Sequence, residues 1–143
     1  MVVGVSLMKS TSFDPVAPMT GRDAHAVRDL LRGMVNDASL DYIVGILPVN
    51  PRALVHITMV IFDTKNEAQV RGAYDAASQM VREAAKLGYG EYRAHLHFMD
   101  LASEQYSFGD HAYRRFCEKI KDAVDPAGIL SPGRHGIWPS AMR

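Results

Sequence analysis

The residues best suited to chemistry in this chain are an adjacent aromatic and cation, Tyr92 and Arg93. Arginine carries a permanent charge and tyrosine a directional hydroxyl, so together they can stabilise a bound oxyanion and lower the pKa of its parent acid. Spacing alone favours a plainer interpretation, in which Tyr92 is a core aromatic and Arg93 a solvated cation. Neighbours on a regular strand also point to opposite faces, so joint action requires a bend near Gly90.

A second candidate segment is the glycine- and proline-rich tail over residues 131–139, Ser-Pro-Gly-Arg-His-Gly-Ile-Trp-Pro. It contains a cation, Arg134, and the single tryptophan of the chain, Trp138. From composition alone we expect the tail to form a surface loop, in which the large indole ring of Trp138 needs apolar neighbours to pack against.

Histidines are the remaining candidates, because His95 and His97 would share one face of a strand. The other possible ligands, Asp100, His111 and His135, do not complete a recognised spacing. We therefore expect no metal site. The sequence also shows no phosphate-binding glycine loop, dinucleotide fingerprint or nucleophile elbow.

Length and charge limit the class of protein. The 143 residues predict a single domain over residues 1–143, and sixteen basic residues balance sixteen acidic ones. Without a basic face or a run of about 20 apolar residues, we expect neither nucleic-acid binding nor a membrane span. The apolar start precedes its first basic residue, Lys9, which is the wrong order for a secretory leader, so we expect a cytoplasmic protein.

Hydrophobic periodicity gives the elements in order. Residues 1–19 contain Pro15 and Pro18 and are expected to be extended. Helical spacing predicts three helices, over residues 21–36, 66–86 and 111–124, and the last carries Cys117 on its apolar stripe as a small buried residue. Apolar and β-branched runs predict three strands, over residues 42–47, 53–62 and 92–98.

The strand over residues 53–62 has two chemically different faces. Alternation places Val55, Ile57, Met59 and Ile61 on one face and His56 and Thr58 on the other. Two strands joined by a tight turn, then a helix and a further strand, predict an α+β fold. We expect an antiparallel sheet with helices packed on one face.

Two blocks of the sequence resemble a known enzyme family. Residues 88–100, Gly-Tyr-Gly-Glu-Tyr-Arg-Ala-His-Leu-His-Phe-Met-Asp, and residues 124–139 are similar to the C-terminal end of the vanillyl-alcohol oxidase and 4-cresol dehydrogenase (p-cresol methylhydroxylase) family. Residues 13–16 and 42–45 also have counterparts. Members of this family are FAD-dependent and oxidise the benzylic carbon of para-substituted phenols. The resemblance covers most of this chain but only the C-terminal, substrate or cap, part of a family member.

The resemblance assigns roles to the candidate residues. Tyr92 and Arg93 occupy the place of a phenolate-binding pair, whose stabilised phenolate helps a hydride leave the benzylic carbon for the flavin. Arg134 would lie near the flavin as a cofactor-binding cation. Several members attach FAD through a His or Tyr where this chain has Ser10-Thr-Ser, so any FAD here is expected to be non-covalent.

The resemblance also implies partners. The FAD-binding domain belongs to segments outside this chain, so activity is expected only with an FAD-binding domain or subunit and a para-substituted phenol. Oxygen and cytochrome c remain open as electron acceptors, and a homo-oligomer is expected. In that setting the front domain would cover Trp138, Ile137, Phe13 and Val16. The alternative is a free-standing α+β module that binds or assembles and catalyses nothing.

Overall fold

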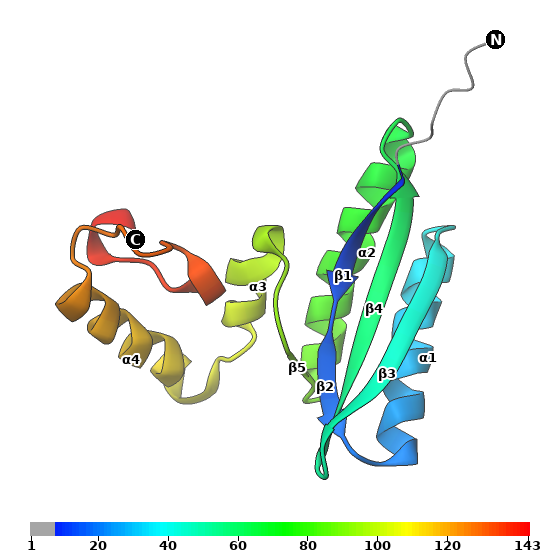
Figure 1. Cartoon of the computed structure of the whole chain (residues 1–143), viewed down its shortest axis with the longest axis horizontal. Coiled ribbons are helices and arrows are strands. Elements are labelled where there is room, and N and C mark those ends of the chain that lie inside the picture. The colour runs from blue at the N-terminus through cyan, green and yellow to red at the C-terminus, as the bar shows by residue number, and fades with distance from the viewer. Residues whose placement is uncertain (1–7) are drawn as a thin grey trace. The chain divides into compact units, whose positions relative to one another are not determined.

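The computed structural model describes residues 8–143. The chain divides into two compact units, the first ending at Arg93 and the second spanning Ala94–Arg143 (Figure 1).

The first unit is an antiparallel sheet with two helices. Its elements in chain order are β1 (Met8–Phe13), β2 (Pro15–Pro18), α1 (Gly21–Asp37), β3 (Asp41–Asn50), β4 (Ala53–Asp63), α2 (Glu67–Lys86) and β5 (Gly90–Glu91). Strand β4 is central: β3 pairs along one edge, β1 and β2 share the other edge, and β5 pairs with β2. The predicted α+β fold with an antiparallel sheet is confirmed.

Strands β1 and β2 behave as one long strand that is interrupted at Asp14. The β1 ladder ends where Phe13 pairs with Thr58, and the β2 ladder resumes where Val16 pairs with Val55. Pro15 has no backbone N–H to donate, which favours a break in the ladder at this point. The interruption places the Asp14 side chain in the interior, with only 7% of its surface exposed.

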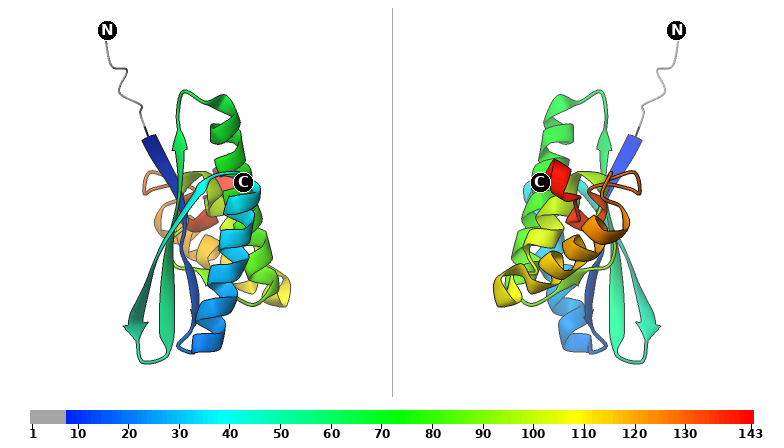
Figure 2. Two further views of the ribbon diagram at one scale, coloured as in Figure 1. Left: turned by 90° about the vertical axis from the view of Figure 1, so that its right-hand side faces the viewer. Right: turned by 90° about the vertical axis from the view of Figure 1, so that its left-hand side faces the viewer.

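Both long helices begin at side-chain caps. Thr20 accepts a hydrogen bond from the backbone of Asp23 at the start of α1, and Asn66 caps α2 in the same way. Helix α1 buries Val27, Leu31 and Val35, whereas α2 presents mainly alanines to the sheet. The two helices lie on the same face of the sheet (Figure 2).

The two faces of β4 separate as predicted, but the inner one carries polar groups. His56 and Thr58 are fully buried on the helix side together with Val60. On the opposite face four large apolar side chains are 37–49% exposed, and we call them the outer face: Ile43, Leu47, Ile57 and Met59. Within the described part of this unit, no helix packs on that face (Figure 2).

The second unit is helical. It contains η1 (Leu96–Phe98), α3 (Met99–Glu104), α4 (Phe108–Val124), η2 (Arg134–Gly136) and η3 (Ser140–Met142). The predicted strand over residues 92–98 is wrong, because β5 ends at Glu91. His95 instead accepts a hydrogen bond from the backbone of His97, and Phe98, Met99 and Ala102 are buried at helical spacing.

Helix α4 is placed as predicted but is not buried. Gly109, Asp110 and His111 have positive φ angles, so regular helix follows His111. None of its residues is buried, and Cys117 is only half-buried, contrary to expectation. Four exposed apolar side chains lie in the regular part of α4 after His111, and we call them the α4 stripe: Tyr113, Phe116, Ile120 and Val124.

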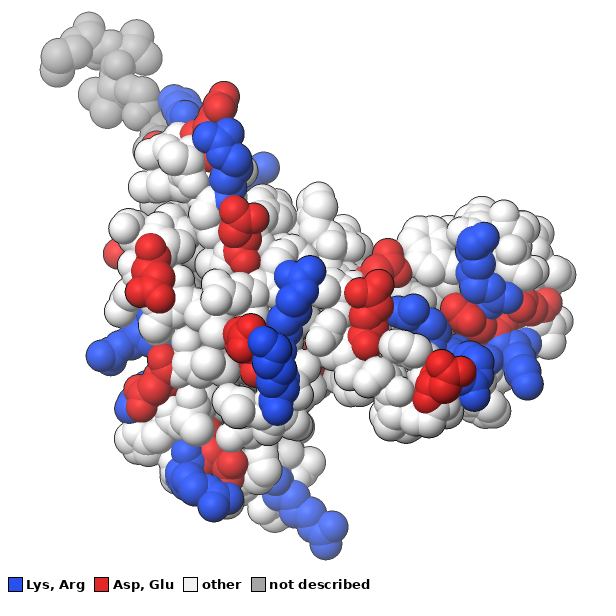
Figure 3. Space-filling model, turned by 180° about the vertical axis from the view of Figure 1, so that it is seen from behind, with Lys and Arg blue, Asp and Glu red and all other residues white. Residues whose placement is uncertain are grey.

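The surface carries charges of both signs. On the face that Figure 3 shows, acidic and basic side chains are interspersed rather than gathered by sign. Across residues 8–143, the helices lack the combined length and apolar character that crossing a membrane requires.

Candidate functional site

The Tyr92–Arg93 turn lies where the first unit ends. The Tyr92 amide donates a hydrogen bond to the Asp14 carbonyl at 2.8 Å, and the chain bends immediately after β5. The Tyr92 side chain is 61% exposed, and Arg93 is exposed as well. Tyr92 is therefore not a core aromatic. The bend also removes the strand alternation that would send the two side chains to opposite faces.

A buried carboxyl group, that of Asp14, lies beside this turn. Burial raises its pKa above the ordinary range, while the backbone amide of Thr58 and the charge of Arg93 act in the opposite direction. Its Oδ1 atom has no hydrogen-bond partner among the described residues. A buried oxygen that accepts no hydrogen bond lowers the stability of the folded state unless a further group donates to it.

A second carboxyl group, that of Glu91, stands next to Asp14. Glu91 pairs with Pro15 across the β2–β5 ladder. Burial raises the pKa of Glu91 to about 7, and the neighbouring Asp14 charge adds to the effect. Glu91 is therefore partly protonated at neutral pH.

Sequence reasoning identified neither Asp14 nor Glu91 as a candidate. The Asp14-Pro15 step marks a strand interruption, which is a local signal that could have identified the first. Glu91 had no such signal, since its raised pKa comes first from burial in the folded chain and then from Asp14, which lies far earlier in the sequence.

His56 is a structural group of the inner sheet face. Its Nε2 lies 3.2 Å from the Ala24 carbonyl. The Pro15 carbonyl also acts on the ring by raising its pKa. Burial lowers its pKa more than these carbonyls raise it, so the ring is neutral at pH 7. The contact ties β4 to the first turns of α1.

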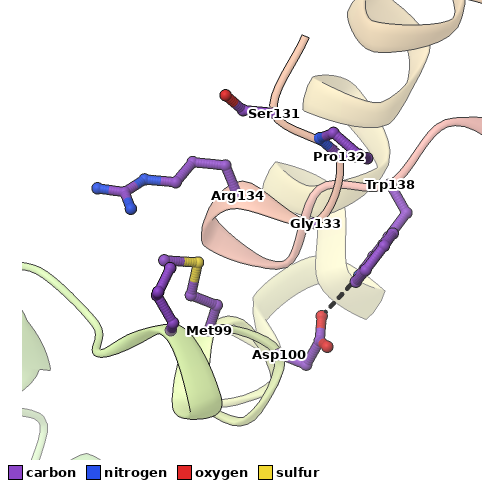
Figure 4. Close-up of a pocket in the computed structure, with 8 residues that line it drawn as sticks. Met99, Asp100, Ser131, Pro132, Gly133, Arg134 and Trp138 are labelled. Atoms are coloured by element: carbon purple, nitrogen blue, oxygen red, sulfur yellow. Dashed lines mark hydrogen bonds between the residues drawn. The ribbon is translucent and has the colours of Figure 1, made fainter. Parts of the chain in front are cut away.

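Arg134 borders a shallow cavity of about 350 Å³ inside the second unit. The lining comes from the start of this unit and from the tail: Leu96, Met99, Asp100, Ser131, Pro132, Gly133, Arg134 and Trp138. The Arg134 side chain extends away from the Trp138 ring (Figure 4). Arg134 belongs to the second unit, whereas the Tyr92–Arg93 turn belongs to the first.

The chain itself covers much of Trp138. A β-carbon added to Gly133 would lie 2.4 Å from the indole ring, so the ring rests directly on that glycine. The indole nitrogen donates to the Asp100 carboxylate at 2.7 Å (Figure 4). Of the surface that a front domain was expected to cover, Phe13 is also buried, at 1% exposure.

The histidines do not form a metal centre in the described part of the chain. The rings of His95 and His97 stack with centroids 5.3 Å apart. Across residues 8–143, no group of three or more His, Cys, Asp or Glu side chains is placed to hold a metal ion.

The similarities to known proteins agree with the sequence resemblance. A family model described as FAD linked oxidases, C-terminal domain, matches residues 53–135. The chain is 30% identical over 125 residues to the 4-cresol dehydrogenase [hydroxylating] flavoprotein subunit of Pseudomonas putida. That match covers 87% of this chain and 23% of the relative.

Two solved structures are also similar. The 4-ethylphenol oxidase of Gulosibacter chungangensis, in complex with isoeugenol, superimposes with a TM-score of 0.90 at 36% identity. The match covers 95% of this chain and 26% of the oxidase. A p-cresol methylhydroxylase with substrate bound gives a TM-score of 0.83 at 30% identity over 90% of this chain and 24% of its own.

The chain thus spans about a quarter of the length of the proteins that it matches. The resemblance to 4-cresol dehydrogenase is confirmed by sequence and by structure. The chain belongs to the family of FAD linked oxidases, as part of their C-terminal domain.

Proposed function

We propose that this chain is the substrate-binding C-terminal part of an FAD-dependent oxidoreductase that oxidises para-substituted phenols at the benzylic carbon. It works with an FAD-binding domain or subunit. The observation that carries the proposal is the exposed Tyr92–Arg93 turn, which is fastened to Asp14 and flanked by ionisable carboxyl groups.

The chain's own residues contribute to substrate activation. The Arg93 guanidinium and the Tyr92 hydroxyl bind the phenol oxygen and stabilise its ionised form. Loss of the phenolic proton raises the electron density of the ring, which favours departure of a hydride from the para-benzylic carbon. FAD, when bound, supplies the hydride acceptor. Both protein groups act by stabilising the negative charge on the oxygen.

The described residues fit a role in covering a flavin rather than in holding one alone. The outer face of the first unit offers exposed apolar side chains that a flavin-binding domain can cover. Arg134, an exposed cation of the second unit, is proposed separately as a contact to the cofactor. No glycine-rich segment of residues 8–143 begins a helix in the manner of a diphosphate-binding loop. We therefore propose that FAD is non-covalent, that a partner domain supplies its main contacts, and that this chain alone binds FAD weakly.

Complementation tests the proposal. The FAD-binding front of a family member would be expressed separately, mixed with this chain, and treated anaerobically with 4-ethylphenol. Flavin bleaching that needs both chains is the expected result. The matched control adds the Arg93→Ala chain. If the two proteins form a stable flavin complex that no para-alkylphenol reduces, the proposed reaction is wrong.

The apolar outer face and the α4 stripe favour a second candidate, a non-catalytic binding or assembly module. Such a module would purify as a colourless, well-folded oligomer, and added flavin domain would not associate with it. Analytical ultracentrifugation with and without the flavin domain separates the two functions.

A further inference from the structure

We propose that Asp125 is a positioning residue, whose buried carboxylate fixes the loop that presents Arg134 to the cofactor. The inference rests on the proposed function, in which Arg134 contacts FAD. From the sequence alone, Asp125 with the following Pro-Ala-Gly marks only the end of a helix.

The Arg134 side chain is not held by contacts of its own. It is exposed and extends away from the Trp138 ring (Figure 4). Within residues 8–143 its guanidinium takes part in no salt bridge or hydrogen bond. The backbone around it is ordered, since the Arg134 amide donates to the Ser131 carbonyl at 3.2 Å. The place of this cation is therefore set by the loop that carries it.

Asp125 anchors that loop on the side that precedes Arg134. Only 6% of the Asp125 surface is exposed. Its Oδ1 atom accepts a hydrogen bond from the Ile129 amide, and its Oδ2 atom accepts one from the Leu130 amide, both at 2.9 Å. The turn from Ser131 to Arg134 begins directly after Leu130, so the carboxylate fixes the backbone immediately before this turn.

Lys121 completes the anchor from the last turns of α4. Its Nζ atom lies 2.5 Å from Oδ2 of Asp125 and also donates to the Leu130 carbonyl. The Lys121 side chain is 11% exposed, so both charges of the pair are largely removed from water and each has its partner. A carboxylate that accepts from two amides and one ammonium group favours one conformation of the loop.

A second carboxylate holds the segment that follows Arg134. Asp100 accepts the indole nitrogen of Trp138 at 2.7 Å. Arg134 thus lies between two carboxylate anchors of the same unit. Asp100 is exposed, whereas Asp125 is buried, so water can replace the contacts of Asp100 more easily than those of Asp125.

NMR of the full chain tests the anchor without flavin. In Asp125→Asn the new side chain has lost its charge and keeps only one oxygen that can accept. The heteronuclear NOE of the Arg134 amide should fall from the value of ordered backbone to that of a mobile loop. Asp122→Asn is the matched control, because this carboxylate also lies on α4 but contacts Ser140 and Arg143. Both of these residues follow the Arg134 segment, so the control should leave that NOE unchanged.

Exchanging the two charges separates positioning from plain ion pairing. The double variant Lys121→Asp/Asp125→Lys keeps an opposite-charge pair between the same positions, but a lysine cannot accept the Ile129 and Leu130 amides. The double variant should therefore leave the Arg134 amide as mobile as Asp125→Asn does. Recovery of the NOE would show that charge pairing alone orders the loop.

Affinity for FAD in the reconstituted complex tests whether Asp125 acts through Arg134. Each chain would be mixed with the separately expressed flavin domain and titrated with FAD, with flavin fluorescence as the readout. Arg134→Ala should weaken FAD binding about tenfold, the effect of losing one contact to a charged group, and Asp125→Asn should weaken it about threefold. In the Arg134→Ala background, Asp125→Asn should add less than about twofold, because the group that it positions is gone.

Three results would overturn the inference: an ordered Arg134 amide in Asp125→Asn, its recovery in the charge exchange, or an undiminished effect of Asp125→Asn in the Arg134→Ala background. If Asp125→Asn does not fold by circular dichroism, Lys121→Gln replaces it and should also lower the Arg134 NOE, since it removes the cation of the anchor. A lowered NOE together with an Arg134→Ala chain of unchanged FAD affinity would instead contradict the cofactor contact in the proposed function.

Discussion

The indole nitrogen of Trp138 donates a hydrogen bond to the Asp100 carboxylate at 2.7 Å, which joins the tail to α3 across 38 positions of the chain. Helix α3 also packs on η2, where Gly136 lies so close that an added β-carbon would be 2.5 Å from Ser103. The tail is therefore held by its own unit, and its glycines allow that close packing.

Gly133→Ala should destabilise the second unit by about 2–4 kcal/mol. The new methyl group would overlap the Trp138 ring, and the backbone there has a φ of +77°, which disfavours alanine. Urea unfolding followed by the fluorescence of the single tryptophan measures the change. Gly33→Ala, at an open helical position of α1, is the control and should stabilise its helix by about 0.5–1 kcal/mol. Equal stability of the two variants would contradict the packing described for the tail.

Asp100→Ala should release Trp138 without unfolding the chain. The variant loses a hydrogen bond to a charged acceptor, a contribution of about 1.5 kcal/mol, and leaves the indole nitrogen to water. We expect a red-shifted emission maximum and stronger quenching by acrylamide. Asp75→Asn should leave both unchanged, and an unshifted Asp100→Ala spectrum would show that the bond does not hold the ring.

Glu91→Gln should make the protein more stable at alkaline pH. The folded-state pKa of Glu91 is about 7 and its ordinary value is 4.5, so between these values the folded state keeps a proton that the unfolded state has lost. The free energy of unfolding of the natural chain therefore falls as pH rises from 4.5 to 7. Glutamine cannot ionise, so the variant avoids this loss. Its free energy of unfolding should exceed that of the natural chain by about 2–3 kcal/mol at pH 8 and should equal it at pH 4. Urea midpoints at both pH values measure it, and a constant difference between the two chains would refute the assignment.

In the reconstituted complex, Arg93→Ala should slow flavin reduction by a para-alkylphenol about 10²–10³-fold. Arg93 would touch the phenol oxygen, whereas Arg134, near the flavin, would mainly alter cofactor affinity. Tyr92→Phe should fall between the two, since it removes one hydroxyl and keeps the ring. Stopped-flow absorbance gives the rates. Unchanged reduction by Arg93→Ala would mean that the phenol binds elsewhere.

Two adjacent positions of β4 should respond oppositely to lysine. Met59→Lys lies on the outer face and should change the free energy of unfolding of the isolated chain by less than about 1 kcal/mol, but prevent association with the flavin domain. Thr58→Lys would bury a charge on the inner face and should unfold the unit. Thermal melts and a pull-down with the flavin domain report the two effects, and a folded Met59→Lys chain that still associates would exclude the outer face as the contact surface.

Local signals were sufficient for the main elements but not for burial. Thr20 with Asp23, and the helical spacing of Val27 and Leu31, placed α1 correctly because caps and periodicity are properties of neighbouring residues. The sequence after Glu91 predicts a strand because its aromatic residues favour strands. In the structure the Tyr92 amide donates a hydrogen bond to the Asp14 carbonyl, and β5 ends at Glu91.

Burial and charge depend on contacts that the sequence does not display. The alternation of β4 separated its two faces correctly, but hydrophobicity alone would have placed His56 outside and Met59 inside. Glu91 comes near Asp14 only because β5 pairs with β2, where Glu91 lies opposite Pro15. The roles of Tyr92, Arg93 and Arg134 remain predictions that rest on the family resemblance and on the exposed turn.

The outer face has a consequence for how this sequence can change over time. Ile57 and Met59 contribute little to the interior of their own unit, so replacing them should barely affect folding of the isolated chain. Selection for folding alone would allow polar residues at such positions, because their apolar side chains add little to the stability of the unit. Apolar residues kept at these positions across related chains would indicate selection by a second surface. A library of variants at these positions, sorted once for abundance and once for association with a flavin domain, would therefore separate selection for folding from selection for binding.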